Sequence, residues 1–577
     1  MARTRADART GLRSRGSLAA MVLLSLVLGT FFVWPLIESV RGAFFEPDGS
    51  FTLAYVAAVF ENPIYLEGFR NSILVASAST ALAALIGVPL ALLFGRYEFP
   101  GRQALAALVP LPLFVPPFVG ALGIQKLLGP TGALNSVLVS LGLMDRAAPY
   151  DWLREGRFGA VVALTALHLY PILFFHLTTA LQQQNPELER AASLLGARGL
   201  RRAWRVTLPL AAPSLFAGLT IIFISALTEL GVPLLCDYGR VVSVQIFAGL
   251  KDIGQNPLVY ALVTVTLLFT LLLYGLARLV LGRPPDPGAG LKGHFKHERR
   301  QLPRSLRILA TSVVAGSLVL ASLPNFSVIL LASSHDWYET ALPTGLTLEH
   351  YRAALGHSLV VPSIANSLRY VFWATALDLV LGFSIAWITV RTRLPGRKLL
   401  DATSMMPLLL PGLVMAFGYL AISRPGRPLG FLDPVVDPTA LLVIAYATRR
   451  LPFVVRSTEA GLYQVSVTLE EAARSLGAKQ LAVIRRVTLP LVAPHLLAGG
   501  LLAFALSMLD VSDSLVLAQK QEFFPVTKAI YELSQLLGNG RYLAAALGVW
   551  AMLLLGFAVT VARRVAERSR IAPRNDG

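Results

Sequence analysis

Ionisable side chains that interrupt the apolar runs of this chain are its first candidates for chemistry. Glu229 and Asp510 occupy equivalent positions 281 residues apart. Each follows a proline by 16 residues, which is about 24 Å of helix at 1.5 Å per residue. A charge inside a membrane is costly, so such residues mark a transport pathway by default. Four further residues share this setting and are candidate pathway residues, namely Asp513, Arg449, Arg450 and His168.

The signs of these charges conflict. Acidic groups would attract a cation and arginines an anion, so charge alone does not identify a cargo. The alternative is that these groups pair with one another or cap a helix near the membrane interface. Asp378, whose counterpart in the first half is Ala83, is interpreted as a local structural feature. No His, Cys or Asp cluster has catalytic or metal-ligand spacing, and the single Cys236 excludes a disulfide within the chain.

Composition places these residues in a membrane. The chain has 577 residues, of which 55% are hydrophobic and 15% charged, and its mean hydropathy is +0.62. Apolar runs of roughly 18 to 25 residues suit helices that cross about 30 Å of hydrocarbon, and lipid leaves few alternatives to a helix. The formal net charge of +18 comes from Arg and Lys clustered at the ends of these runs. That pattern is typical of cytoplasmic loops and does not indicate nucleic acid binding.

Twelve spans are predicted, with both termini in the cytoplasm, because an odd number would place one terminal arginine cluster outside. The first run is too long for a signal peptide and is interpreted as an uncleaved span. The predicted spans are 17–40, 71–94, 104–127, 158–181, 213–235, 258–281, 308–331, 366–390, 399–422, 438–455, 494–517 and 543–561.

The chain consists of two similar halves. Asn71-Ser72 matches Asn366-Ser367, and Arg96 matches Arg391, both at an offset of 295. Six spans per half is an even number, so the halves are parallel repeats, and a pathway at their interface follows. We therefore predict an all-α membrane protein with a first transmembrane domain at 1–282, a basic cytoplasmic linker at 283–307 and a second domain at 308–577.

A polar stretch repeats between the fourth and fifth spans of each half. The segments Pro186–Leu215 and Val467–Leu496 share RVTLPLxAPxL at an offset of 281. In each copy an alanine and a glycine four residues apart lie on one helical face, where another backbone can approach closely. The glycine permits a turn into a second short helix, which a proline then ends or bends. The segment thus predicts a helix-turn-helix on the cytoplasmic face, shaped to dock on another protein.

These loops, at about 186–213 and 467–494, resemble the EAA motif (EAAxxxG, then I/V-x-LP) of permease subunits of binding-protein-dependent ABC importers. The resemblance covers essentially the whole chain and implies the type I importer permease fold. It also implies that each EAA helix docks in a cleft of an ATPase. The first copy departs from the pattern, because Arg190 stands at the position of Glu471. The implied coupling residues are Glu189, Ala191, Ala192, Gly196, Leu208, Pro209, Glu470, Glu471, Ala472, Ala473, Gly477, Leu489 and Pro490.

The resemblance implies partners and a cargo class. The chain has no GxxxxGK[ST] phosphate loop, so ATP and Mg would be bound by a separate ATPase homodimer, and this chain would bind no cofactor. A soluble binding protein would deliver the solute, and the permease would move it into a bacterial cytoplasm by alternating access. The segment from Arg456 to Leu462 together with LEEAARSLGA most resembles ferric-iron permeases, and thiamine, polyamine and phosphonate permeases are similar in pattern. An ion-gradient-driven transporter is the alternative class, and a membrane-embedded enzyme lacks a catalytic constellation here.

Overall fold

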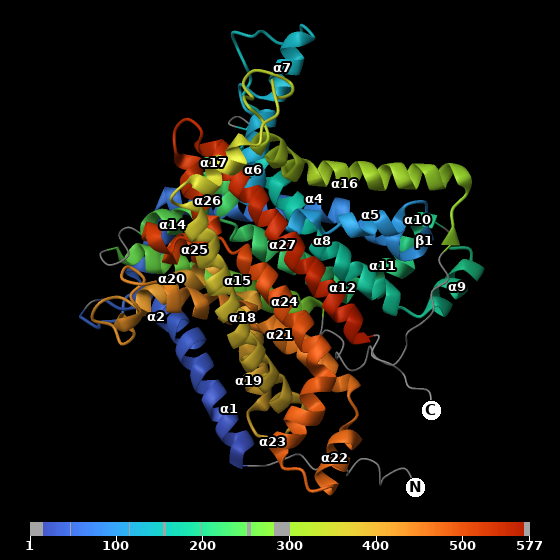
Figure 1. Cartoon of the computed structure of the whole chain (residues 1–577), viewed down its shortest axis with the longest axis vertical. Helices are drawn as coiled ribbons and strands as arrows, with labels where there is room; N and C mark the ends of the chain where they lie inside the picture. The colour runs from blue at the N-terminus through green and yellow to red at the C-terminus, as the bar shows by residue number, and fades with distance from the viewer. Residues whose placement is uncertain are drawn as a thin grey trace. The chain divides into compact units, whose positions relative to one another are not determined.

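The computed structural model describes residues 15–46, 48–114, 116–153, 157–197, 199–250, 256–281 and 300–570, which are almost wholly helical (Figure 1). Two strands of two residues each, β1 (Tyr97–Glu98) and β2 (Arg300–Gln301), pair in parallel. The all-α prediction is therefore confirmed. The basic N-terminal residues before 15 and the predicted linker up to residue 299 lie outside the described residues. Helix α16 (Arg304–Ala332) begins before the predicted end of that linker.

Within the described residues, nine helices are long and apolar enough to span a membrane, or eleven if each of two bent helix pairs is one span. The remaining predicted span, 438–455, coincides with α21 (Thr439–Gln464), a helix of 26 residues. Arg449 and Arg450 in its middle lower its hydropathy, which separates it from the other eleven.

The long helices and the polar loops follow one another in the same order in both halves. Those of the first half are α1 (Arg15–Leu28), η1 (Gly29–Val33), α2 (Trp34–Phe44), α3 (Ala54–Glu61), α4 (Pro63–Arg96), α5 (Arg102–Leu108), η2 (Leu111–Phe114), α6 (Pro117–Leu128), α7 (Ala133–Ser140), α8 (Arg157–Gln183), α9 (Pro186–Leu194), α10 (Gly199–Arg202), η3 (Ala203–Thr207), α11 (Leu208–Leu210), α12 (Ala212–Leu227), α13 (Gly231–Leu235), α14 (Val242–Gly249) and α15 (Pro257–Leu281). Those of the second half, after α16, are α17 (Glu349–Gly356), α18 (Val360–Arg391), α19 (Arg397–Met405), η6 (Met406–Leu409), α20 (Gly412–Ile422), η7 (Gly430–Leu432), α21, α22 (Val467–Ser475), α23 (Gln480–Val483), η8 (Ile484–Thr488), α24 (Leu489–Met508), α25 (Ser512–Leu517), η9 (Gln521–Phe523), α26 (Val526–Gln535) and α27 (Gly540–Arg570).

The chain folds into two compact units whose boundaries differ from those of the sequence halves. One unit, here the first unit, takes its described residues from 43–361 and 528–552. The second unit takes its described residues from 1–42, 362–527 and 553–577. The opening helix of each half therefore belongs to the unit built mainly from the other half.

In the first unit, α16 packs on α6 and contributes to the core formed by α4, α8 and α12. Val314 and Leu318 of α16 are buried with Leu173 and Leu177 of α8. Gly123 of α6 lies so close to α16 that a Cβ there would be 2.2 Å from the Ser327 hydroxyl. Only glycine allows this approach, because any side chain would displace the α16 backbone.

In the second unit, α1 packs in the same way on the core of α18, α19 and α21. Leu24 and Leu28 of α1 are buried with Ile385 and Trp387 of α18 and with Leu451 of α21. Packing of these apolar side chains fixes α18 and α21, because van der Waals contacts drive helix association within a membrane. Helix α21 continues into the polar loop of that half, and α18 ends at Arg391, which contacts the same loop.

Candidate functional site

Each EAA loop is a helix-turn-helix, as the sequence predicts. Helix α9 ends before Gly196, whose φ is +86°, and α22 ends before Gly477, whose φ is +85°. In both turns the glycine N–H and the N–H after it bond back to the helix, which is the Schellman arrangement. A side chain in this left-handed conformation would be strained, so the two glycines are required by the backbone.

A buried carboxylate joins each loop to the end of a long membrane helix. In the first unit, Glu189 of α9 lies 2.7 Å from Arg96, the last residue of α4, and accepts a hydrogen bond of 2.8 Å from Thr207. Arg96 also donates to the Leu181 carbonyl at 3.0 Å, which secures the end of α8. We call Glu189, Arg96 and Thr207 the first loop anchor.

The second unit contains the equivalent group. Glu470 of α22 lies 3.0 Å from Arg391, the last residue of α18, and accepts a hydrogen bond of 3.1 Å from Thr488. Arg391 donates to the Leu462 carbonyl at 2.9 Å, as Arg96 does to Leu181. The side chains of Glu470 and Arg391 are only 1% and 7% exposed. Glu470, Arg391 and Thr488 form the second loop anchor.

The loop anchors change the roles assigned to two predicted coupling residues. Glu189 and Glu470 are inside the chain, where their carboxylates hold the loop, so their side chains do not form a free docking surface. Ala191, Ala472 and both turn glycines are exposed, whereas Ala192, Ala473 and Glu471 are partly exposed. Arg190, at the position of Glu471, is exposed and pairs with Glu187 at 2.7 Å. The departure of the first copy therefore concerns the surface and leaves its anchor intact.

Leucines dominate the exposed tip of each loop. Leu195 and Leu476 occupy equivalent positions immediately before the turn glycine, and each is 89% exposed. Leu194 of the first loop is exposed to the same degree. An isolated exposed leucine is ordinary, but matched leucines at the tips of two repeated loops indicate a surface that another protein covers.

The prolines after the two loops differ in effect. Pro490 does not end the second short helix, because one helix runs from Gln480 to Met508. Five π-helical residues, η8, precede Leu489, and η3 occupies the equivalent place before Leu208 and Pro209. A π-turn shifts the hydrogen-bond register, so a proline following it is tolerated. In the first copy the helix does break, at Ala211 between α11 and α12.

In the second unit, four of the predicted pathway residues form one buried charge cluster. Asp510 lies 2.9 Å from Arg449 and 3.0 Å from Arg450, and Arg449 lies 3.3 Å from Asp513. Asp510 and Asp513 are almost fully buried. Asp378, predicted to be a local structural feature, is also buried, and both of its carboxylate oxygens lack a hydrogen-bond partner among the described residues. Its role stays a prediction.

Glu229 and Asp510 lie at equivalent helix breaks, the first between α12 and α13 and the second between α24 and α25. Glu229 accepts a hydrogen bond from the Gly231 N–H at 3.1 Å, and Asp510 accepts one from the Asp513 N–H at 2.9 Å. Both acids thus cap the short helix that follows. The capping and pairing that the sequence left as an alternative do occur, and a role in the pathway stays a prediction.

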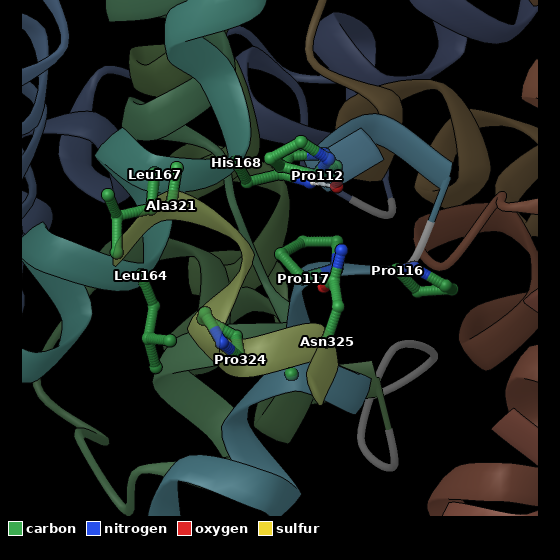
Figure 2. Close-up of a pocket in the computed structure, with 10 residues that line it drawn as sticks. Pro112, Pro116, Pro117, Leu164, Leu167, His168, Ala321, Pro324 and Asn325 are labelled. Carbon is green, nitrogen blue, oxygen red and sulfur yellow. Dashed lines mark hydrogen bonds between the residues drawn. The ribbon is translucent and has the colours of Figure 1, made fainter. Parts of the chain in front are cut away.

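His168 lies at a second kind of break, where the third predicted span bends by 96° between α5 and α6. Its Nδ1 is 2.9 Å from the Pro112 carbonyl, and Asn325 donates to the Leu111 carbonyl at 3.2 Å. Both side chains line a cavity of about 20 Å³ among prolines (Figure 2). That volume holds about one water molecule. These side chains satisfy carbonyls that the interrupted helix leaves without partners.

Arg449 is the equivalent of His168 and also lies against a helix break. A Cβ built on Gly412 would be only 2.0 Å from the Arg449 guanidinium. Gly412 begins α20 after the 109° bend of the ninth predicted span. In the second unit, one arginine thus contacts this bend and the Asp510 break together. Interrupted helices at corresponding positions of two repeats are typical of transporter substrate sites.

Sequence reasoning missed the cationic and hydroxyl partners in the loop anchors and the exposed leucines. Arg96 and Arg391 matched at an offset of 295, and Thr207 and Thr488 lie in the identical RVTLPL segment. These two matches were the available sequence signal for the loop anchors. They did not reveal that the arginine and the acid meet, because 79 residues separate Arg391 from Glu470.

We expect Asp510→Asn to lower the stability of the purified chain markedly. The change removes the one carboxylate that pairs with both Arg449 and Arg450, and breaking a buried ion pair costs on the order of 3–5 kcal/mol. Arg146→Gln removes an exposed ion pair with Glu339 and should cost less than about 1 kcal/mol. Thermal unfolding in the same detergent compares the two. Equal melting temperatures would show that the cluster contributes nothing to stability.

Comparison with known proteins agrees with this architecture. Residues 87–283 and 378–570 each match the family described as binding-protein-dependent transport system inner membrane component. A ferric transport system permease protein of Actinobacillus pleuropneumoniae is 27% identical over 513 residues, which cover 85% of this chain and 70% of the relative. A similarly named protein of Haemophilus influenzae is 26% identical over 513 residues, or 86% of this chain and 77% of the relative. The molybdenum transport system permease protein ModB of Escherichia coli K12 is 33% identical over 219 residues, covering 36% of this chain and 94% of the relative.

The family matches cover one polar loop each and together more than half of the chain. Membership of this family argues against the alternative of an ion-gradient-driven transporter. It identifies the chain as a transport component and not as an enzyme. The chain belongs to the family of binding-protein-dependent transport system inner membrane components and is a multi-pass permease of an ABC importer.

Proposed function

We propose that this permease imports ferric iron from a soluble binding protein into the cytoplasm. Two of the relatives that match most of the chain are named ferric transport system permeases, whereas the molybdenum relative matches about a third of it. Thiamine, polyamines and phosphonates remain the alternative cargoes. The buried charges carry both signs and do not distinguish among them.

The energy source in this proposal is a separate ATPase homodimer that binds ATP and Mg. The observation that carries this proposal is the pair of EAA loops, each with the same loop anchor and the same exposed leucine. Both loops and both chain termini then face the cytoplasm. One ATPase subunit contacts each loop through Leu195 or Leu476, with the surrounding alanines allowing close approach.

The loop anchors explain how motion of the ATPase reaches the membrane helices. A loop tied only by its chain connections would move alone when the ATPase closes. Glu189 is bonded to the end of α4, and Glu470 to the end of α18. Displacement of a loop therefore displaces a helix of 34 or 32 residues. The halves alternate between inward-open and outward-open states as the two ATPase subunits close and separate.

Reconstitution tests the cargo and the energy source together. The chain is incorporated into liposomes with its ATPase and its binding protein, and ⁵⁵Fe(III) accumulation is measured with ATP inside the vesicles. We expect uptake that requires ATP, Mg and the binding protein. Thiamine, spermidine, a phosphonate and molybdate serve as competitors. ATP-driven uptake of one of these without iron uptake would replace the cargo, and uptake without nucleotide hydrolysis would refute the ATPase coupling.

A further inference from the structure

A polar cavity of about 560 Å³ lies in the first unit, apart from the EAA loops and the predicted pathway residues. It is enclosed by the C-terminal end of α6, the start of α8, the end of α13, the end of α26 and the start of α27. Its volume is within the range of small-molecule sites in proteins. The polar and charged residues that line it are Gln125, Lys126, Thr131, Asp151, Arg157, Asp237, Ser534, Gln535 and Arg541.

Cations in this cavity are incompletely compensated. Arg541 is exposed and has no hydrogen bond or ion pair with any described residue. It is close enough to Lys126 for the two positive charges to repel each other. Lys126 donates to the Trp337 carbonyl at 3.1 Å and lies over the Tyr542 ring. Asp336 attracts Lys126 and so offsets part of this charge.

The acids lining the cavity do not neutralise Arg541. Asp151 accepts a hydrogen bond from the Leu153 N–H at 3.1 Å, which shapes its own turn. Arg157 donates to the backbone carbonyl of Asp237 at 2.9 Å. Asp237 itself has a φ of +56°, in the left-handed region that aspartate adopts more readily than most residues.

The cavity lies at the opposite end of α8 from the first EAA loop. Arg157 is the first residue of α8, and two residues separate the end of α8 from the start of α9. A helix of 27 residues is about 40 Å long, which exceeds the thickness of the hydrocarbon layer. If the loop faces the cytoplasm, as the proposed function requires, the cavity opens on the outer side. That placement, and not the binding chemistry, rests on the proposed function.

We propose that this cavity binds a small polyanion with carboxylate or phosphate-type oxygens at the outer mouth of the permease. The guanidinium of Arg541 supplies a planar set of donors that matches such oxygens, and Lys126 supplies a second positive charge. The bound anion separates two cations that otherwise repel. The anion is either a free solute or an acidic side chain of the docked binding protein, since both present the same oxygens.

The test uses the purified full-length chain in lipid nanodiscs at constant ionic strength, with citrate and inorganic phosphate as probes. We expect citrate to raise the melting temperature saturably. Arg541→Gln should weaken citrate binding about tenfold, the effect of one charge-assisted pair. Lys126→Gln provides an independent variant if the first fails to fold. Arg70→Gln is the matched control, because Arg70 is an exposed arginine of α4 that does not line the cavity, and its change should be below twofold.

Absence of a saturable effect for both probes, or equal weakening by Arg70→Gln and Arg541→Gln, would overturn the site. Two further arms identify the source of the anion. Citrate that displaces the binding protein from the wild-type chain, but not from Arg541→Gln, indicates an acidic side chain of that protein. Citrate accumulated by proteoliposomes indicates a solute. Failure of iron uptake would leave the binding result unchanged, so the two proposals fail separately.

Discussion

Glu470→Ala is expected to abolish ATP-driven uptake although the chain still inserts into the membrane. The substitution leaves Arg391 buried without its carboxylate, and removal of one partner of a buried ion pair costs on the order of 3–5 kcal/mol. A helix of nine residues has little stability of its own, so α22 should detach from α18. Uptake by proteoliposomes and limited proteolysis of the loop measure the two consequences.

The first loop supplies the matched control. Glu187 and Glu189 lie two residues apart on α9, but Glu187 forms an exposed ion pair with Arg190, whereas Glu189 is buried. Glu187→Ala should change stability by less than about 1 kcal/mol, and Glu189→Ala should impair uptake as Glu470→Ala does. Equal proteolysis of both variants would show that the loop anchor does not hold the loop.

The anchor also predicts a partial rescue. Combining Glu470→Leu with Arg391→Met removes both charges, and apolar replacement of a whole buried pair is often tolerated where removal of one partner is not. The double variant should therefore be more stable than Glu470→Ala. Thermal unfolding of the two variants measures this difference, and a double variant that is less stable would contradict the assigned ion pair.

Leu476→Asp is expected to reduce association with the ATPase by one to two orders of magnitude while the fold is unaffected. The side chain is 89% exposed, so its replacement should change stability by no more than about 0.5 kcal/mol. Truncation of a hot-spot residue in an interface costs about 2 kcal/mol or more, and a desolvated carboxylate adds to the loss. Association of the purified permease with the ATPase, measured by surface plasmon resonance, gives the change in Kd.

Leu537 provides the comparison for this variant. It is 98% exposed and lies between α26 and α27, beyond the two EAA loops. Leu537→Asp should leave ATPase association unchanged, and Leu195→Asp should reproduce the effect of Leu476→Asp. If all three variants bind the ATPase alike, the leucines at the loop tips take no part in docking.

Much of the helical arrangement could be predicted because a membrane restricts the options. Eleven of the twelve predicted spans correspond to apolar helices or bent helix pairs, and the remaining one, 438–455, corresponds to α21. The predicted helix-turn-helix was correct because its glycine, small residues and polar flanks act locally. The continuation of the helix through Pro490 was not predicted, because a π-helical segment ahead of a proline depends on backbone register and has no distinct residue pattern.

The amino-acid sequence by itself determined the membrane location, the two parallel repeats and the paired polar loops, since these depend on composition and on periodic matches along the chain. Only the tertiary structure decided that α1 and α16 each pack in the unit built mainly from the other half, and that Glu189 and Glu470 are buried anchors. Those facts depend on which residues meet across tens or hundreds of positions. Packing and the pairing of buried charges select such contacts, and neither leaves a local pattern in the sequence.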